Sequence, residues 1–304
     1  MSTTTDRTTS IGASEAAAAI GVSPWKSRFA LWAEKTGQIE PDNLDDVERV
    51  QWGNYLQPKI GEVLAEKTGR TVRQNRSNVS RVHPRYPWMS ATPDGLQRVN
   101  GGPIGDLEIK TTNEFNADQW KTEPPLHYQV QLVHQMLVTG HAWGTLAVLI
   151  GGQKLVWRDF VQEGMDVAGL EDPIIVSHLL AKGIYASESY FWQLVESRTP
   201  PPIDGSADTA EALKRLYGVE NGQAVELPAE AEEWDRELQQ AKEQIKALEG
   251  IKREHENLLK GAIGAATYGL LPDGSRYQWK GRERNEPARE ARTITYRELR
   301  RLKK

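Results

Sequence analysis

The stretch "PWMSATPDGLQRVNGGPIGDLEIKTTNEF", residues 87–115, sets three charged side chains within a segment that otherwise favours strands. Asp94 stands between a proline and a glycine, which favours a turn, and Glu108 and Lys110 lie in the short apolar run "DLEIKTT". In a strand, residues i and i+2 point to the same face, so Glu108 and Lys110 project together while Ile109 points into the opposite layer. The turn at Asp94 can bring a second carboxylate beside them.

Two converging carboxylates form an oxygen-rich site of the kind that suits Mg²⁺ or Mn²⁺. These ions keep several waters and take phosphate oxygens as further ligands. Lys110 would position or activate an attacking water and offset the negative charge that grows on the phosphate. The pattern therefore points to phosphodiester hydrolysis. An E-x-K pattern also arises by chance, most often as a surface salt bridge. The rest of the chain has to decide between a catalytic site and a salt bridge of this kind.

Composition limits the classes of protein that remain. The 304 residues, 38% of them hydrophobic, can form one large domain or one domain with an appendage. The net charge is −4, so any nucleic-acid-binding surface must be local. The absence of cysteine excludes disulfides and thiolate metal sites. No apolar run approaches the roughly 20 residues of a membrane span, and no signal-peptide pattern opens the sequence, so we expect a cytoplasmic protein.

The order of predicted elements indicates an α/β (α+β) fold with a small mixed β-sheet flanked by helices. Hydrophobic spacing predicts helices near residues 14–20, 26–35, 45–67 and 127–139, and strands within 71–99, 106–112 and 143–162. After Pro173 the chain is expected to be helical. We expect a flexible segment at 1–9, the core at 10–200, and at 201–304 a helical arm interrupted at Gly250, a β-hairpin and a basic tail.

Two further features allow DNA contacts without requiring them. Several of the ten tryptophans lie beside basic or turn residues, which fits base stacking or ordinary packing: Trp25, Trp88, Trp120, Trp157 and Trp279. From residue 276 to the end, eleven basic and four acidic residues give a net charge of +7. Such a tail fits a surface that faces phosphates, or a solvated terminus that aids solubility.

The segments around the D…ExK pattern narrow the choice. In chain order they are "IGASEAAAAIGVSPW", "WGNYLQPKIGEVLAEKTG", "SATPDG", "GDLEIKTT", "PLHYQVQLVHQMLVTG" and "LAVLI". Over residues 7–165 this combination resembles the YqaJ-type viral recombinase family, phage-type exonucleases of the PD-(D/E)xK superfamily that include lambda exonuclease.

The resemblance implies a restriction-endonuclease-like nuclease core and a Mg²⁺-dependent exonuclease. Such an enzyme degrades one strand of linear double-stranded DNA from its 5′ end and leaves 3′ single-stranded overhangs for recombination by strand annealing. It also implies a phage or prophage protein, a single-strand annealing protein as partner, and a homotrimer.

Carried over by residue, the resemblance assigns the metal ligands to Asp94, Glu108 and the carbonyl of Ile109, with Mn²⁺ as a possible substitute for Mg²⁺. Lys110 becomes the catalytic lysine. Gln129 and Gln131 match a "QVQ" that lines the site in relatives. They would orient ligands or DNA, unless they only satisfy backbone groups.

The same comparison gives residues for DNA. Arg7, seven residues before Ser14, would bind the terminal 5′ phosphate, with Ser14 and Thr92 in the same pocket. Ser14 is also expected to cap the helix that follows it. In the tail, the DNA-facing candidates are Arg297, Arg300 and Arg301.

One position departs from the family pattern. The helix before the sheet usually carries Glu four residues after its glycine, whereas here Gln57 follows Gly53. A neutral amide removes a negative charge, which leaves open whether one or two metals bind. Two alternatives therefore stay open: a weakened or inactive nuclease scaffold that binds DNA or a protein partner, and a structure-selective endonuclease. The Arg7 pocket favours recognition of DNA ends.

Overall fold

The computed structural model describes residues 8–75 and 78–281. By its internal contacts the chain divides into two compact units, one up to Gly218 and the other from Val219 onward.

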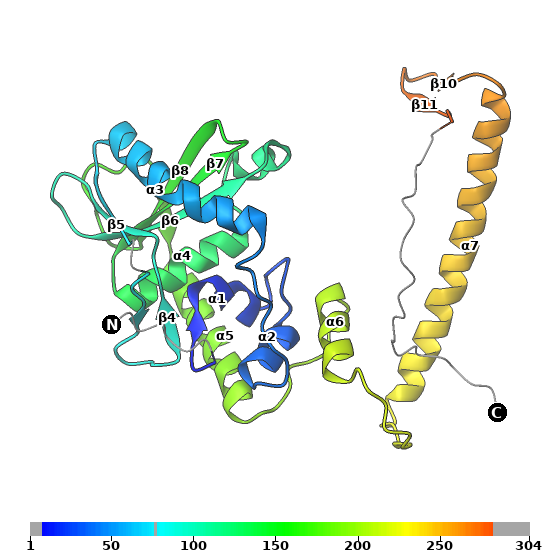
Figure 1. The fold of residues 1–304 in the computed structure, drawn as a ribbon, viewed down its shortest axis with the longest axis horizontal. Coiled ribbons are helices and arrows are strands. Elements are labelled where there is room, and N and C mark those ends of the chain that lie inside the picture. Colours follow the sequence, from blue (N-terminus) through cyan, green and yellow to red (C-terminus); the bar gives the residue numbers. More distant parts are fainter. Residues whose placement is uncertain (1–7, 76–77, 282–304) are drawn as a thin grey trace. The chain divides into compact units, whose positions relative to one another are not determined.

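A six-stranded mixed sheet forms the centre of the first unit (Figure 1). Its order is β2 (Thr71–Gln74), β5 (Gly95–Arg98), β6 (Gly105–Thr112), β7 (Trp143–Ile150), β8 (Lys154–Gln162) and β9 (Ile174–Val176). The pairs β6–β7 and β8–β9 are parallel, and the other neighbours are antiparallel. The parallel pair β6–β7 requires a crossover, which α4 (Leu126–Thr139) supplies.

A smaller sheet carries the chain towards Asp94. In it β4 (Met89–Ala91) lies between β1 (Ile11–Gly12), which is parallel to it, and β3 (Arg81–Val82), which is antiparallel. The turn after β4 leads directly into β5 of the main sheet, so Asp94 lies where the two sheets meet.

Helices cover the main sheet on both faces. On one face α3 (Glu48–Thr68) packs Leu64 against Leu107 and Ile109 of β6. On the other face α4 packs Leu132 against Leu146 of β7. Because side chains alternate along a strand, the apolar residues of β6 lie under α3 and its charged residues point towards α4.

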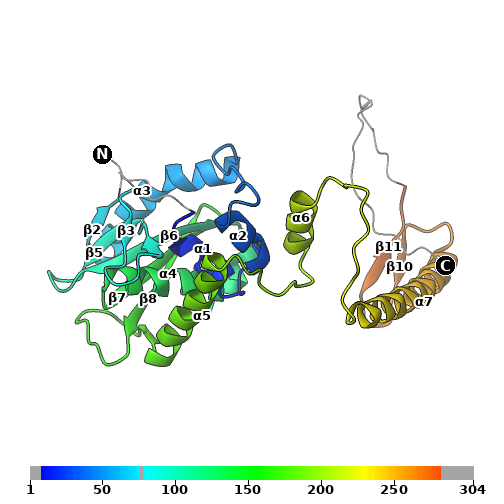
Figure 2. The same cartoon turned by 90° about the horizontal axis from the view of Figure 1, so that it is seen from below.

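Helices α1 (Ala13–Ala19) and α5 (His178–Glu196) pack against α4 (Figure 2). Helix α2 (Arg28–Lys35) packs against α1 and α5, and α6 (Ala207–Leu216) packs against α2. A 3₁₀ helix spans Glu114–Trp120. Leu31 and Phe191 are fully buried in the cluster that they share. Ala212 of α6 belongs to the same cluster, so α6 is part of the first unit.

The expected mixed α/β architecture is confirmed, with three local corrections. Residues 174–176 form the edge strand β9 instead of starting a helix, because they pair with β8. Gly12 is the N-cap of α1, so Ser14 is not; Glu15 accepts from the Gly12 amide at 2.8 Å. The predicted helix near residue 26 begins later, where the Ser27 side chain caps α2.

The second unit contains one long helix and a hairpin. Helix α7 (Ala231–Ile263) runs through Gly250 without a break, which corrects the expected interruption. The strands β10 (Tyr268–Leu270) and β11 (Arg276–Gln278) pair around the predicted Pro-Asp-Gly turn. None of the α7 residues is buried.

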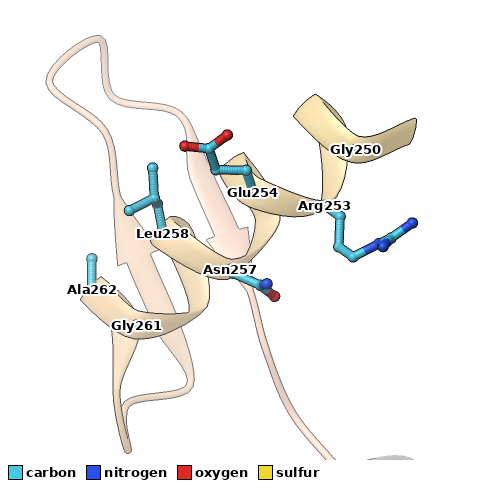
Figure 3. A pocket seen from close by; sticks show the side chains of 7 residues that line it. All are labelled: Gly250, Arg253, Glu254, Asn257, Leu258, Gly261 and Ala262. Atoms are coloured by element: carbon cyan, nitrogen blue, oxygen red, sulfur yellow. The ribbon is translucent and has the colours of Figure 1, made fainter. Parts of the chain in front are cut away.

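Figure 3 shows a shallow hollow along the end of α7, lined by Gly250, Arg253, Glu254, Asn257, Leu258, Gly261 and Ala262. Within residues 8–75 and 78–281, no helix has the length and apolar character needed to cross a membrane.

Candidate active site

Asp94 is tied to the middle of β6 by a backbone hydrogen bond. The Ile109 amide donates to Asp94 Oδ2 at 2.7 Å, so the Asp94 carboxylate lies beside the backbone that joins Glu108 to Lys110. The antiparallel pairing of β5 with β6 ends at Gly95 and Leu107. Beyond that point the side chain of Asp94 takes the place of the neighbouring strand.

The same geometry gives a direction to the Ile109 carbonyl. In a strand, the N–H and C=O of one residue point to the same side. Since the Ile109 N–H points to Asp94, its carbonyl oxygen points to that same edge, where β5 no longer pairs with β6. Three oxygen-bearing groups therefore lie beside the part of β6 that β5 leaves unpaired: the Asp94 carboxylate, the Ile109 carbonyl and the nearby Glu108 carboxylate.

Lys110 lies next to Glu108, as their strand spacing requires. The Lys110 ammonium is 2.6 Å from Glu108 Oε1, and it lies 5.1 Å from the centroid of the Tyr128 ring. Glu108 is buried, whereas about a fifth of the Lys110 side chain stays accessible. The ammonium is thus fixed between a carboxylate and an aromatic face.

Helix α4 holds Glu108 from the other side through amide side chains. Gln131 Nε2 donates to Glu108 Oε1, and Gln135 Nε2 donates to Oε2 at 2.6 Å. One turn further on, Thr139 donates to Asp106 Oδ2 at 2.7 Å. Positions 131, 135 and 139 share one helix face, so Gln135 joins the predicted Gln131 at Glu108. Gln135 was not among the predicted site residues, although its spacing of four from Gln131 is a signal in the sequence.

The charged groups of the cluster shift one another's pKa. Burial, reinforced by the negative charge of Glu108, raises the pKa of Asp94 well above its usual range. Burial lowers the pKa of Lys110, but the charges of Glu108 and Asp94 outweigh this effect and raise it overall. Lys110 is therefore a charged ammonium at neutral pH, a donor and not a general base.

The donor set fits a hard divalent cation. Two carboxylates and a backbone carbonyl are the oxygen ligands that Mg²⁺ and Mn²⁺ take, and a cation would relieve the repulsion between Asp94 and Glu108. The part of the chain that the structure describes contains no group of three or more acidic or histidine side chains placed to hold a metal. Ligation would thus rest on two carboxylates, with carbonyl and water oxygens for the rest.

Gln57 occupies the place where a third carboxylate was expected. A Cβ atom on Gly53 would lie 3.9 Å from Thr111, and one on Gly61 would lie 3.6 Å from Ile109. Gln57 is four residues from each glycine, so it lies on the face of α3 that covers β6. It is half-buried there, whereas Glu108 and Lys110 point to the other face of β6, towards α4.

Ser14 and Thr92 lie at the same end of a strand pair. Gly12 of β1 is paired in parallel with Ser90 of β4, and Ser14 and Thr92 each follow their member of this pair by two positions. Both side chains are exposed. Thr92 is also two residues from Asp94 in the sequence.

Other predicted residues lie elsewhere. Gln129 turns to the backbone, where its amide donates to the Pro124 carbonyl at 2.6 Å, which matches the simpler of its two expected roles. Four DNA candidates lie outside the described residues: Arg7, Arg297, Arg300 and Arg301.

A fully buried pair, His134 and Glu188, lies next to the strand that leads to Asp94. His134 Nδ1 lies 2.8 Å from Glu188 Oε1, and His134 Nε2 lies 3.0 Å from the Ser90 carbonyl. A carbonyl only accepts, so Nε2 carries a proton. Burial opposes a charge on His134, but Glu188 and the Ser90 carbonyl outweigh it and raise the pKa of His134. The pair joins α4, α5 and the strand that leads to Asp94.

Comparison with known proteins places this chain in a family. A family model described as the YqaJ-like viral recombinase domain matches residues 4–142. The Bacillus subtilis (strain 168) protein YqaJ is 32% identical over 282 residues, which cover 90% of this chain and 81% of that protein. The chain belongs to the YqaJ family. The membership inferred from the motifs is thereby confirmed.

Solved structures with similar folds include the alkaline exonuclease LHK-Exo of Laribacter hongkongensis, with a TM-score of 0.48 and 22% identity over 63% of this chain and 90% of that one. Its complex with dAMP gives a TM-score of 0.47 and 23% identity over 70% and 95%. A phage-related exonuclease of Haemophilus somnus 129PT gives 0.41 and 12% over 62% and 96%.

Proposed function

We propose that this YqaJ-family chain is a metal-dependent deoxyribonuclease that degrades one strand of linear duplex DNA from the 5′ end. The observation that carries the proposal is the convergence of Asp94, Glu108 and Lys110 at the open edge of β6. Membership of a viral recombinase family agrees with an enzyme that prepares DNA ends for recombination.

Each residue has a role that follows from its position. Asp94, Glu108 and the Ile109 carbonyl would hold Mg²⁺, with Mn²⁺ as a substitute. The bound cation supplies activation of a water and neutralisation of phosphate charge. Lys110, as an ammonium, would donate to the attacking water or to the phosphate. Gln135 and Gln131 keep Glu108 in one orientation.

Direction along the strand would come from the hydroxyl pair. Ser14 and Thr92, together with Arg7, would bind the terminal 5′ phosphate and place the first phosphodiester bond at the carboxylates. The product would be a 3′ single-stranded overhang. A single-strand annealing protein is the proposed partner that receives it, and a homotrimer, with the basic tail on DNA, is the proposed assembly.

Digestion of end-labelled DNA tests the proposal. A linear duplex with one 5′-phosphorylated strand should shorten from that end in Mg²⁺, and it should stay intact in EDTA. A closed circle of the same sequence should survive. Cutting of the circle would instead indicate an endonuclease, and shortening from the 3′ end would overturn the proposed direction.

Gln57 favours a second candidate, a scaffold that binds DNA and cuts it weakly. Gln57→Glu restores the carboxylate that the family pattern has at this position. If the native chain cuts, the variant measures what the neutral amide costs. If only the Gln57→Glu variant cuts, the native protein is a binding scaffold. Binding of the same duplex in EDTA should be similar for both proteins.

A further inference from the structure

Trp25, in the loop between α1 and α2, has an exposed ring that is held in one place. The side chain is 59% exposed, yet its ring meets His127 edge-on with centroids 4.4 Å apart. Ser23 Oγ accepts from the backbone amides of Trp25 and Lys26, each at 3.2 Å, and Lys26 is fixed by Glu34 at 2.6 Å. The loop therefore presents the flat apolar surface of the Trp25 ring to solvent, and most of this ring is not part of the core.

Aromatic rings connect this surface to the candidate active site. The Trp25 ring centroid is 5.8 Å from that of Tyr128, and the Lys110 ammonium is 5.1 Å from the Tyr128 centroid. The Trp25 ring centroid is therefore at most 10.9 Å, the sum of these two distances, from the Lys110 ammonium. In B-form DNA successive nucleotides advance about 3.4 Å, so Trp25 lies within about three steps of a phosphate held at Lys110.

We propose that Trp25 stacks on a base of the DNA strand close to the phosphate that is cut. This inference rests on the proposed function. A nucleobase presents an apolar face whatever its sequence, and base–aromatic stacking tolerates every base, as a nuclease without sequence preference requires. The Lys110 ammonium, 5.1 Å from the Tyr128 ring centroid, adds a cationic group suited to the backbone of the same strand.

A packing role for Trp25 makes a different prediction. A tryptophan that only supports His127 would be required equally for every DNA, because its loss would disturb the site itself. A stacking tryptophan matters only where a base is present. Removing the base from the DNA, while leaving the sugar and phosphate, separates the two roles.

The test is a binding cycle with the full chain in EDTA, which does not depend on cleavage. One duplex has an ordinary 5′-phosphorylated end, and the other carries abasic residues at the first three positions of that strand. Trp25→Ala should weaken binding of the ordinary duplex about tenfold. It should bind the abasic duplex as the native chain does. Trp25→Phe should recover most of the loss, and thermal melting checks that each variant is folded.

Trp234→Ala is the matched control, because Trp234 is 58% exposed but lies on α7, in the other unit. It should show no difference that depends on the bases. Equal losses by Trp25→Ala on both duplexes, no loss on either, or no DNA binding by the native chain would overturn the inference. Binding that follows the expected pattern without cleavage in Mg²⁺ would reject the exonuclease and leave the stacking role intact.

Discussion

Helices in both units of the chain carry apolar residues at helical spacing, but these residues are buried in the first unit and exposed in the second. In the first unit, Leu64 and Leu132 are fully buried under helices that cover the sheet. In the second, Leu248 and Leu258 are each 63% exposed on α7. Apolar spacing therefore identifies a helix in both units, but only the presence of a second layer turns that face into a core.

The difference in burial also decides which unit can hold the candidate catalytic groups. The carboxylates and the lysine depend on burial, on a strand edge and on helix amides, and all of these lie in the first unit. Helix α7 offers side chains without a buried environment that could shift their charges. We expect changes in the first unit to alter stability or chemistry strongly, and matched changes in α7 to alter little.

The largest effect is expected from the catalytic cluster. Lys110→Ala removes the ammonium that faces the phosphate and should lower the rate of cleavage by at least about a hundredfold. Lys246→Ala removes an exposed lysine of α7 and should leave the rate unchanged. Single-turnover digestion of a labelled duplex measures both. If Lys110→Ala retained the native rate, Lys110 would not be the catalytic lysine.

The buried pair behind the site should give the next largest effect. His134→Ala leaves the Glu188 carboxylate buried without its partner, at a cost of about 3–5 kcal/mol in the free energy of unfolding. Lys252→Ala breaks an exposed α7 pair with Glu256, at 3.8 Å, and should have no measurable effect. Urea titration compares the two, and similar midpoints would show that the His134 pair does not support the fold.

The same pair predicts how stability depends on pH. The folded protein raises the pKa of His134, so its stabilising charge is fully present below the unfolded value of about 6.5 and is lost as the pH rises through the folded value. The stability advantage of the native chain over His134→Gln should therefore shrink from pH 6 upward. Denaturation at several pH values measures it; an advantage that grew with pH would mean that His134 is neutral in the fold.

Truncation of matched leucines tests the comparison directly. Leu64→Ala opens a cavity between α3 and the sheet and should cost about 2–5 kcal/mol. Leu248→Ala, on the exposed face of α7, should change stability by less than about 0.5 kcal/mol. Thermal and urea denaturation give both values. A large loss for Leu248→Ala would reveal that α7 is covered in solution by a second copy or another part of the chain.

The sequence predicted the centre of the site because strand geometry is local. Alternation along "DLEIKTT" separates Glu108 and Lys110 from Ile109 before any tertiary contact is known. The turn at Asp94 follows from its neighbours, proline and glycine. These features depend on backbone geometry over two to four residues, so the structure reproduces them.

Features that depend on partners distant in the sequence could not be predicted from local patterns. Nothing local indicates that Tyr128 lies under the Lys110 ammonium, or that Trp25 meets His127. Residues 174–176 became a strand only because the edge of β8 was available to them. Gly250 did not interrupt α7, because one glycine costs only about 1 kcal/mol among good helix formers.

The smallest effect is expected from removing the second unit altogether. All of the buried hydrophobic side chains in the described part of the chain lie between Ile11 and Ala212. A chain ending at Gly218 should therefore keep a cooperative unfolding transition with nearly the native midpoint, since it loses no buried apolar area of its own. Calorimetry measures the midpoint and the enthalpy. A chain shortened further, to end at Thr199, is the matched control, because it also loses α6 and the burial of Ala212 and should melt at a lower temperature. If the Gly218 chain lost its transition, the second unit would have to pack on the first through contacts that α7 makes only in solution.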